Sequence, residues 1–165
     1  MTSRAMTRAG TVPASLEIPA VAGRLAEVRA FIRAVAAGAG AGDETTSDLV
    51  QAVDELTCNV IEHGYERRPG TIRVSAVEEG DVLVVRIRDA APAFDPRTVP
   101  EPRLDLPLEQ RPLGGMGIHL ARALTDRIDH RILPDGGNEV TVTKRLRPDD
   151  AQEGDDGHHD RTADG

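Results

Sequence analysis

Three polar residues lie four positions apart near the middle of the chain and could perform chemistry together. They are Glu55, Asn59 and His63, with Gly64 directly after them. On a helix with 100° per residue, their side chains point at roughly −120°, −80° and −40° from Leu49. A carboxylate, an amide and an imidazole on successive turns could therefore line a cleft. The spacing also suits a solvated carboxylate, a capping amide and an imidazole that interacts with the helix dipole.

Two further sequence features could bind a ligand. Asp89 ends an apolar strand before a proline-rich segment, where a carboxylate could accept a hydrogen bond from a ligand N–H. An acid at a strand end in a turn is the alternative. Gly114, Gly115, Met116 and Gly117 precede an expected helix. Glycine N–H groups can approach phosphate there, and the helix N-terminus adds a favourable field, although a plain loop has the same composition.

An amphipathic helix over residues 45–64 is expected to position the first of these groups. Its core stripe falls within about 40° of Leu49 and contains Val53, Leu56 and Val60. Thr45 and Asp48 resemble a capping box at its start. A preceding helix is predicted over 21–37 because apolar residues recur three or four positions apart, at Val21, Leu25, Val28, Ile32 and Val35. Glycines at 38–42 separate the two helices.

Alternating apolar residues predict five short strands, over 15–20, 71–77, 82–88, 131–134 and 139–146. Residues 79–81 and 135–138 have turn chemistry. A third helix is predicted from 117 to about 127. Residues 90–113 hold six of the eleven prolines, so we expect a long loop there of the functional or disordered kind. This order suits an α+β two-layer sandwich, in which one sheet carries helices on one face.

Composition and charge restrict the class of protein. A chain of 165 residues suits one domain, and its core must be aliphatic because Phe31, Tyr65 and Phe94 are the only aromatic residues. Residues 148–165 carry most of the net charge of −8, so the rest is nearly neutral and lacks the basic surface of a nucleic-acid-binding protein. A single cysteine, Cys58, excludes an intramolecular disulfide. With neither a membrane span nor a signal peptide, we expect a cytoplasmic protein with disordered ends at 1–13 and 148–165.

Taken together, the three features resemble the nucleotide-binding boxes of the GHKL ATPase superfamily, which unites gyrase, Hsp90, histidine kinases and MutL. They occur in one order: E-x-x-x-N-x-x-x-H-G at 55–64, D-x-x-x-x-F at 89–94 and G-G-M-G at 114–117. The strings VDELTCNVIEHGY, AFDP and GGMGIHLAR look most like its anti-sigma-factor serine/threonine kinase branch. The resemblance implies a histidine kinase-like ATP-binding domain over residues 14–147. Its Bergerat fold has a mixed, mostly antiparallel sheet.

The resemblance also implies roles for individual residues. Glu55 would be the general base that takes the proton from an attacking hydroxyl. Asn59 would bind Mg²⁺ through its amide oxygen, and Asp89 would accept a hydrogen bond from the exocyclic amine of adenine. Residues 95–113 would form the lid over ATP. The other expected cofactor-binding residues are His63, Ala91, Phe94, Gly114, Gly115, Met116 and Gly117.

One departure from the family pattern leaves two functions open. The family usually has D-x-G at the adenine box, whereas this chain has Asp89-Ala90-Ala91. A methyl at Ala91 would lie where adenine passes close to the backbone and would restrict φ. The first function is a serine/threonine kinase that phosphorylates a STAS-type anti-sigma antagonist and sequesters a sigma factor. A homodimer, which relatives often form, is left open by the sequence. The second is a non-catalytic module that binds a partner and has weak or lost nucleotide binding.

Overall fold

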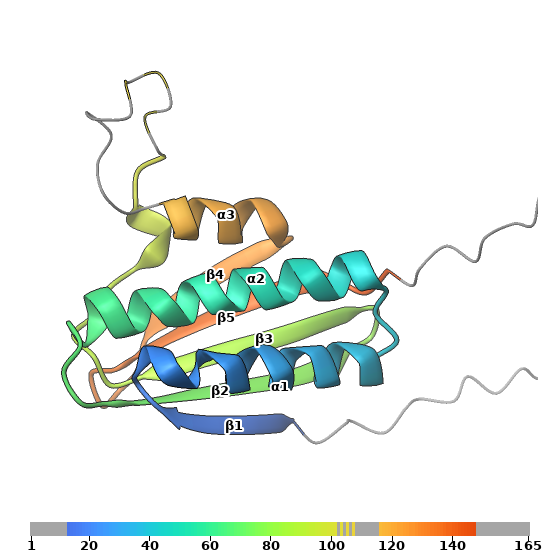
Figure 1. Ribbon diagram of the computed structural model, residues 1–165, viewed down its shortest axis with the longest axis horizontal. Helices are drawn as coiled ribbons and strands as arrows, with labels where there is room; N and C mark the ends of the chain where they lie inside the picture. Colours follow the sequence, from blue (N-terminus) through green and yellow to red (C-terminus); the bar gives the residue numbers. More distant parts are fainter. Residues whose placement is uncertain (1–12, 102, 104, 106, 108–115, 148–165) are drawn as a thin grey trace, which may run out of the picture.

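The fold is a single five-stranded sheet with helices packed on one face (Figure 1). The computed structural model describes residues 13–101, 103, 105, 107 and 116–147. The strands run in the order β1-β2-β3-β5-β4, and all four neighbouring pairs are antiparallel. Their bounds are Ala14–Pro19 (β1), Thr71–Glu79 (β2), Val82–Asp89 (β3), Arg127–Ile132 (β4) and Asn138–Arg145 (β5). The predicted α+β sandwich is confirmed, but the five strands form a wholly antiparallel sheet and not the expected mixed one.

The α-helices of the described residues are Leu25–Gly38 (α1), Asp43–Asn59 (α2) and Met116–Leu124 (α3). Alternate residues of the central strands face these helices, because successive side chains of a strand point to opposite sides. The predicted inward sets of β2 and β3 are buried, as are the helix residues that cover them. These side chains are Ile72, Val74 and Ala76; Leu83, Val85 and Ile87; and Val28, Ile32, Leu49 and Val53. None of the helices in the described ranges is long and apolar enough to cross a membrane.

The start of α2 differs from the prediction. The helix begins at Asp43, and the N–H of Thr46 donates to the carbonyl of Gly42 over 2.9 Å. Gly42 is the N-cap and gives no side-chain bond, so the predicted capping box at Thr45 and Asp48 is wrong. The glycine-rich turn after α1 is shorter than expected, and Thr45 therefore lies inside the first turn of α2.

The end of α2 widens into a single π-helical turn, Val60–Gly64 (η2). The N–H of Tyr65 donates to the carbonyl of Val60 over 2.8 Å, which is the five-residue spacing of a π-helix. The predicted helix over 45–64 is thus α-helical only as far as Asn59. Turns of this kind frequently occur at functional sites.

Two other boundaries were predicted wrongly. Helix α3 ends at Leu124 rather than near Arg127, because the N–H of Asp126 already donates to the carbonyl of Thr143 in β5. Strand β4 then begins at Arg127, four residues before the predicted strand. It is an edge strand of mostly polar residues, so the alternation that reveals a half-buried strand is weak.

At the first helix, Val21 was expected in the apolar stripe. It precedes a 3₁₀ turn, Ala22–Arg24 (η1), and half of its surface is exposed. Residues outside the described ranges include the expected disordered ends apart from Pro13, most of the expected lid beyond Glu101, and the pair Gly114 and Gly115.

Candidate functional site

Asn59, the last residue of α2, lines two neighbouring pockets. The first has a volume of about 320 Å³ with its open mouth included, and we call it the base-side pocket. It is lined by Leu56, Asn59, Val60, Gly64, Asp89, Phe94, Pro96, Asn138 and Val140. The second, of about 430 Å³ on the same measure, is the α3-side pocket. It is lined by Glu55, Cys58, Asn59, Glu62, His63, Gly117 and Ile118.

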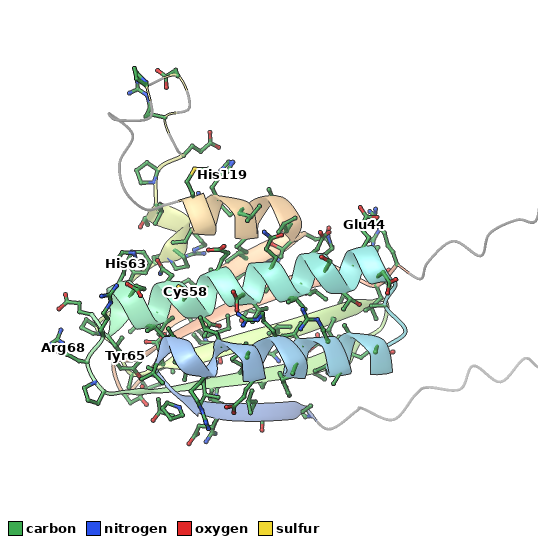
Figure 2. The ribbon with its side chains drawn as sticks, viewed as in Figure 1. Glu44, Cys58, His63, Tyr65, Arg68 and His119 are labelled. Atoms are coloured by element: carbon green, nitrogen blue, oxygen red, sulfur yellow. The ribbon has the colours of Figure 1, made fainter. Side chains whose placement is uncertain are left out.

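These linings bring the three sequence features together. Glu55, Asn59 and His63 line the α3-side pocket together with Gly117. Asn59 also lines the base-side pocket, which contains Asp89. Figure 2 shows His63 in the turn that follows α2, with Cys58 further back on that helix and His119 on the overlying α3. The helix therefore connects two chemically different cavities through one amide side chain.

In the α3-side pocket, Gly117 packs directly against the carboxylate of Glu55. A β-carbon added to Gly117 would lie 2.2 Å from Oε2 of Glu55, well inside van der Waals contact. Within the described ranges the Glu55 side chain has neither a hydrogen bond nor an ion pair, so its oxygens have no protein partner. Burial, followed by the charges of Glu62 and Glu55, raises the pKa of the Cys58 thiol, which lowers the fraction of the reactive thiolate.

In the base-side pocket, Asp89 is 7% exposed, and among the described residues only one of its carboxylate oxygens accepts hydrogen bonds. Its Oδ1 accepts from the N–H of Ala91 and from Nδ2 of Asn138, both over 2.9 Å. Burial raises the pKa of Asp89, and the two bonds from Asn138 and Ala91 oppose that rise. Oδ2 remains as the acceptor that a ligand N–H can use.

Ala91 does not obstruct this pocket. Its side chain is 2% exposed and is absent from the pocket lining. The methyl faces the backbone of Gly64, because a β-carbon added to Gly64 would lie 3.2 Å from it. Among the described non-glycine residues, only Glu66 and Arg67 have positive φ. In this structure the Ala91 methyl therefore lies outside the pocket, and Ala91 has no need of a positive φ.

Asn138 is a residue of the site that the sequence analysis missed. It was assigned to the turn at 135–138, but it is the first residue of β5 and only 4% exposed. The sequence feature that could have revealed it is the alternation with Val140 and Val142. This alternation places the Asn138 side chain on the helix-facing side of the sheet. Gly137, directly before it, lets the chain pass the carbonyl of Asp89, since an added β-carbon would lie 2.2 Å from that oxygen.

Tyr65 is a second missed residue, and it braces the chain segment after Asp89. Its hydroxyl donates to the carbonyl of Thr71 and accepts from the N–H of Ala90, both over 2.8 Å. Its ring lies on Gly70, where an added β-carbon would approach the ring carbons to 2.2 Å. The end of α2 is thus tied to β2 and to the backbone that leads from Asp89 to Ala91.

Arg122 of α3 fixes the segment that follows Phe94. Its guanidinium donates to the carbonyls of Pro96 over 2.6 Å and of Val99 over 3.0 Å. The short 3₁₀ turn Pro96–Thr98 (η3) is therefore attached to the helix that contributes Gly117. Phe94, just before this turn, lines the base-side pocket and is partly exposed.

Comparison with known proteins assigns the class that this fold and these pockets define. Residues 18–144 match the model of the histidine kinase-like ATPase domain, and the chain belongs to this family. The chain is homologous to serine-protein kinases named RsbW. It is 29% identical to RsbW of Bacillus cereus (strain ATCC 10987 / NRS 248) over 136 residues, which are 80% of this chain and 84% of that protein.

RsbW of Bacillus mycoides (strain KBAB4) is 27% identical over the same length, with the same coverage of both chains. A solved structure of the RsbU and RsbW domains of Rv1364c from Mycobacterium tuberculosis matches with a TM-score of 0.58 and 28% identity. The match covers 86% of this chain and 34% of that one, so the chain spans about a third of the solved protein. The recognised family and the Bergerat-type fold are confirmed by these likenesses.

Proposed function

We propose that this protein is an ATP-dependent serine/threonine protein kinase that acts as an anti-sigma factor in the cytoplasm. It would phosphorylate a STAS-type antagonist and sequester a sigma factor, and phosphorylation of the antagonist would preserve that sequestration. The observation that carries the proposal is that Asn59 lines both the pocket of Asp89 and the pocket of Glu55 and Gly117. A nucleotide lying across Asn59 would place its base and its phosphates in different pockets.

The residues present fit ATP and Mg²⁺. Oδ2 of Asp89 suits a ligand N–H, and the Asn59 amide oxygen is a hard ligand of the kind that Mg²⁺ prefers. Bound Mg²⁺ would neutralise charge on the phosphates during transfer. Glu55 has an unpaired carboxylate within the described part of the chain, beside the start of α3, and would accept the proton of the attacking hydroxyl. His63, Phe94 and Met116 would add contacts, together with the glycines at 114, 115 and 117.

The test is phosphotransfer from ATP to a cognate STAS-type antagonist, followed by mass spectrometry of its serine and threonine residues. Wild-type protein should phosphorylate one hydroxyl of the antagonist in the presence of Mg²⁺. The Glu55→Ala variant should bind ATP but transfer no more than background. Equal, background-level transfer by both proteins would show that the kinase proposal is wrong and would favour a non-catalytic binding module.

Replacing Ala91 by glycine should change ATP affinity little, because the methyl faces Gly64 and not the pocket. We expect the Kd to change by less than about threefold, a difference below 0.7 kcal/mol. The lost buried methyl and the added backbone freedom should lower the free energy of unfolding by about 1 kcal/mol. Calorimetric titration and denaturant unfolding measure these effects, and exposed Ala93→Gly is the control. A gain in ATP affinity of tenfold or more would contradict this prediction and show that the Ala91 side chain weakens nucleotide binding.

ATP binding should weaken as the pH falls, and the loss should begin at a higher pH than for an ordinary aspartate. Burial raises the pKa of Asp89, and a protonated carboxyl is a poorer acceptor for the adenine amine. The effect on folding has the opposite sign, because the folded state favours the proton on this group. Asp89 therefore contributes more stability as the pH falls through its raised pKa.

Calorimetry between about pH 4.5 and pH 7.5 tests this dependence. In Asp89→Asn, binding should be weak at every pH. Asp129→Asn, in edge strand β4, is the control: it makes the same substitution away from the pocket and should keep the wild-type pH dependence, including the part that comes from titration of the ATP phosphates. Identical pH profiles for wild type and Asp89→Asn would exclude Asp89 as the group that titrates.

A further inference from the structure

Every polar atom of the Asn138 side chain is already occupied by the protein. Its Nδ2 lies 2.9 Å from Oδ1 of Asp89 and 3.1 Å from the carbonyl oxygens of both Ala91 and Pro92. Its Oδ1 accepts from the N–H of Phe94 over 3.0 Å and lies 3.1 Å from Nε2 of His130. Asn138 lines the base-side pocket, but with two N–H groups and three acceptors it has no donor left for a ligand.

The partners also fix which way the amide points. Two carbonyl oxygens and a carboxylate surround Nδ2, and these groups accept hydrogen bonds. The backbone N–H of Phe94 lies on the other side and can only donate. A flipped amide would place acceptor against acceptor and donor against donor, so one orientation is enforced. This orientation presents a donor to Oδ1 of Asp89, which leaves Oδ2 as the acceptor for a ligand.

The same amide extends the network to the segment after Phe94. The His130 side chain is 5% exposed, and its Nδ1 lies 3.8 Å from Oδ2 of Asp95. Oδ1 of Asp95 in turn accepts from the N–H of Arg97 over 2.9 Å, which caps η3. One side chain thus connects the acceptor in the base-side pocket with the backbone at the start of the expected lid.

We infer that Asn138 is a positioning residue that determines the base specificity of this pocket by fixing Asp89 as a hydrogen-bond acceptor. The inference rests on the proposed function. A 6-amino purine offers an N–H to Oδ2 of Asp89, whereas a 6-oxo purine offers a second acceptor and is rejected. A residue that only stabilised the fold would change the affinities for both purines by the same factor.

The test compares the Kd values of ATP and inosine triphosphate for wild type and Asn138→Asp, measured calorimetrically with Mg²⁺. Wild type should bind ATP at least about tenfold more tightly than inosine triphosphate, since a missing partner leaves a buried group unpaired. Asn138→Asp is the same size, but it puts a second carboxylate beside Asp89, and one of the two then holds a proton. A protonated carboxyl can donate to the 6-oxo group, so the Kd ratio should fall towards one. Gln51→Glu, on the exposed face of α2, makes the same amide-to-acid change away from the pocket and should retain the wild-type ratio.

Asn138→Ala is the second variant, because it frees Asp89 without adding charge, and its ratio should also fall. An unchanged ratio in a folded variant, or a wild type that binds both nucleotides equally, would overturn the inference. A wild type that binds neither nucleotide would overturn the proposed function instead. If neither variant folds, amide hydrogen exchange of the wild-type protein with each nucleotide tests the inference instead. ATP should slow exchange at Phe94 more than inosine triphosphate at equal saturation, and equal protection would contradict the inference.

Discussion

Replacing Asn59 by alanine is expected to raise the Kd for ATP in the presence of Mg²⁺ by about a hundredfold, or about 2.7 kcal/mol. Asn59 is the side chain that lines both pockets, so its loss affects the region where base and phosphates would join. Without Mg²⁺ the same substitution should cost only a few-fold, because the lost group is a hard oxygen ligand for the ion. Phosphotransfer to the antagonist should fall at least as far as ATP affinity.

The fold itself should tolerate this change. Asn59 has no hydrogen bond to another part of the described chain, and unfolding should become easier by less than about 1 kcal/mol. Gln51→Ala, two turns earlier on the exposed face of α2, is the control. Calorimetry with Mg²⁺ and with a chelator separates the contribution of Asn59 to metal binding from its direct contribution to ATP binding. If Mg²⁺ strengthens ATP binding equally in wild type and Asn59→Ala, another group holds the metal.

Local periodicity was sufficient to predict most of the fold. The inward sets of β2 and β3 follow from strict alternation, and the core stripe of α2 follows from a spacing of three and four residues. It failed where a long-range bond decides the structure. Strand β4 begins at Arg127 because Asp126 pairs with Thr143, and nothing in the local sequence records that pairing. The π-turn after Asn59 is likewise invisible in apolar spacing, since Val60 is buried in either kind of helix.

For the candidate site, the sequence predicted the polar residues but not how they pack. Glu55, Asn59 and Asp89 are polar residues beside apolar runs, and their order along the chain revealed the family. The packing around them was not predictable, because it joins segments that are far apart in sequence. Whether the Ala91 methyl enters the pocket depends on where Gly64 lies, and only the structure supplies that position. Asn138 escaped notice because Asp-Gly-Gly-Asn is a strong turn signal, and that signal outweighed the alternation that begins at its last residue.

The contact between α2 and α3 has a consequence for catalysis that stability measurements alone would miss. Gly117 leaves room for the Glu55 carboxylate, and an added β-carbon would meet its far end, 2.2 Å from Oε2, rather than the backbone. The rotatable glutamate side chain should therefore move, and the fold should remain intact. Gly117→Ala should leave the free energy of unfolding unchanged or raise it by up to about 1 kcal/mol, since alanine favours the helix.

Phosphotransfer by Gly117→Ala should fall by about ten- to a hundredfold, because a misplacement near 1 Å is enough to cost that much. Gly38→Ala, at the end of α1 with open space around it, is the matched control and should keep full activity. Calorimetric titration with ATP and Mg²⁺ identifies the cause. If Gly117 acts through Glu55, Gly117→Ala should lower phosphotransfer while the Kd for ATP stays within about threefold of wild type. If the Kd rises as much as phosphotransfer falls, Gly117 contacts the phosphates independently, and the crowding of Glu55 is not what lowers activity.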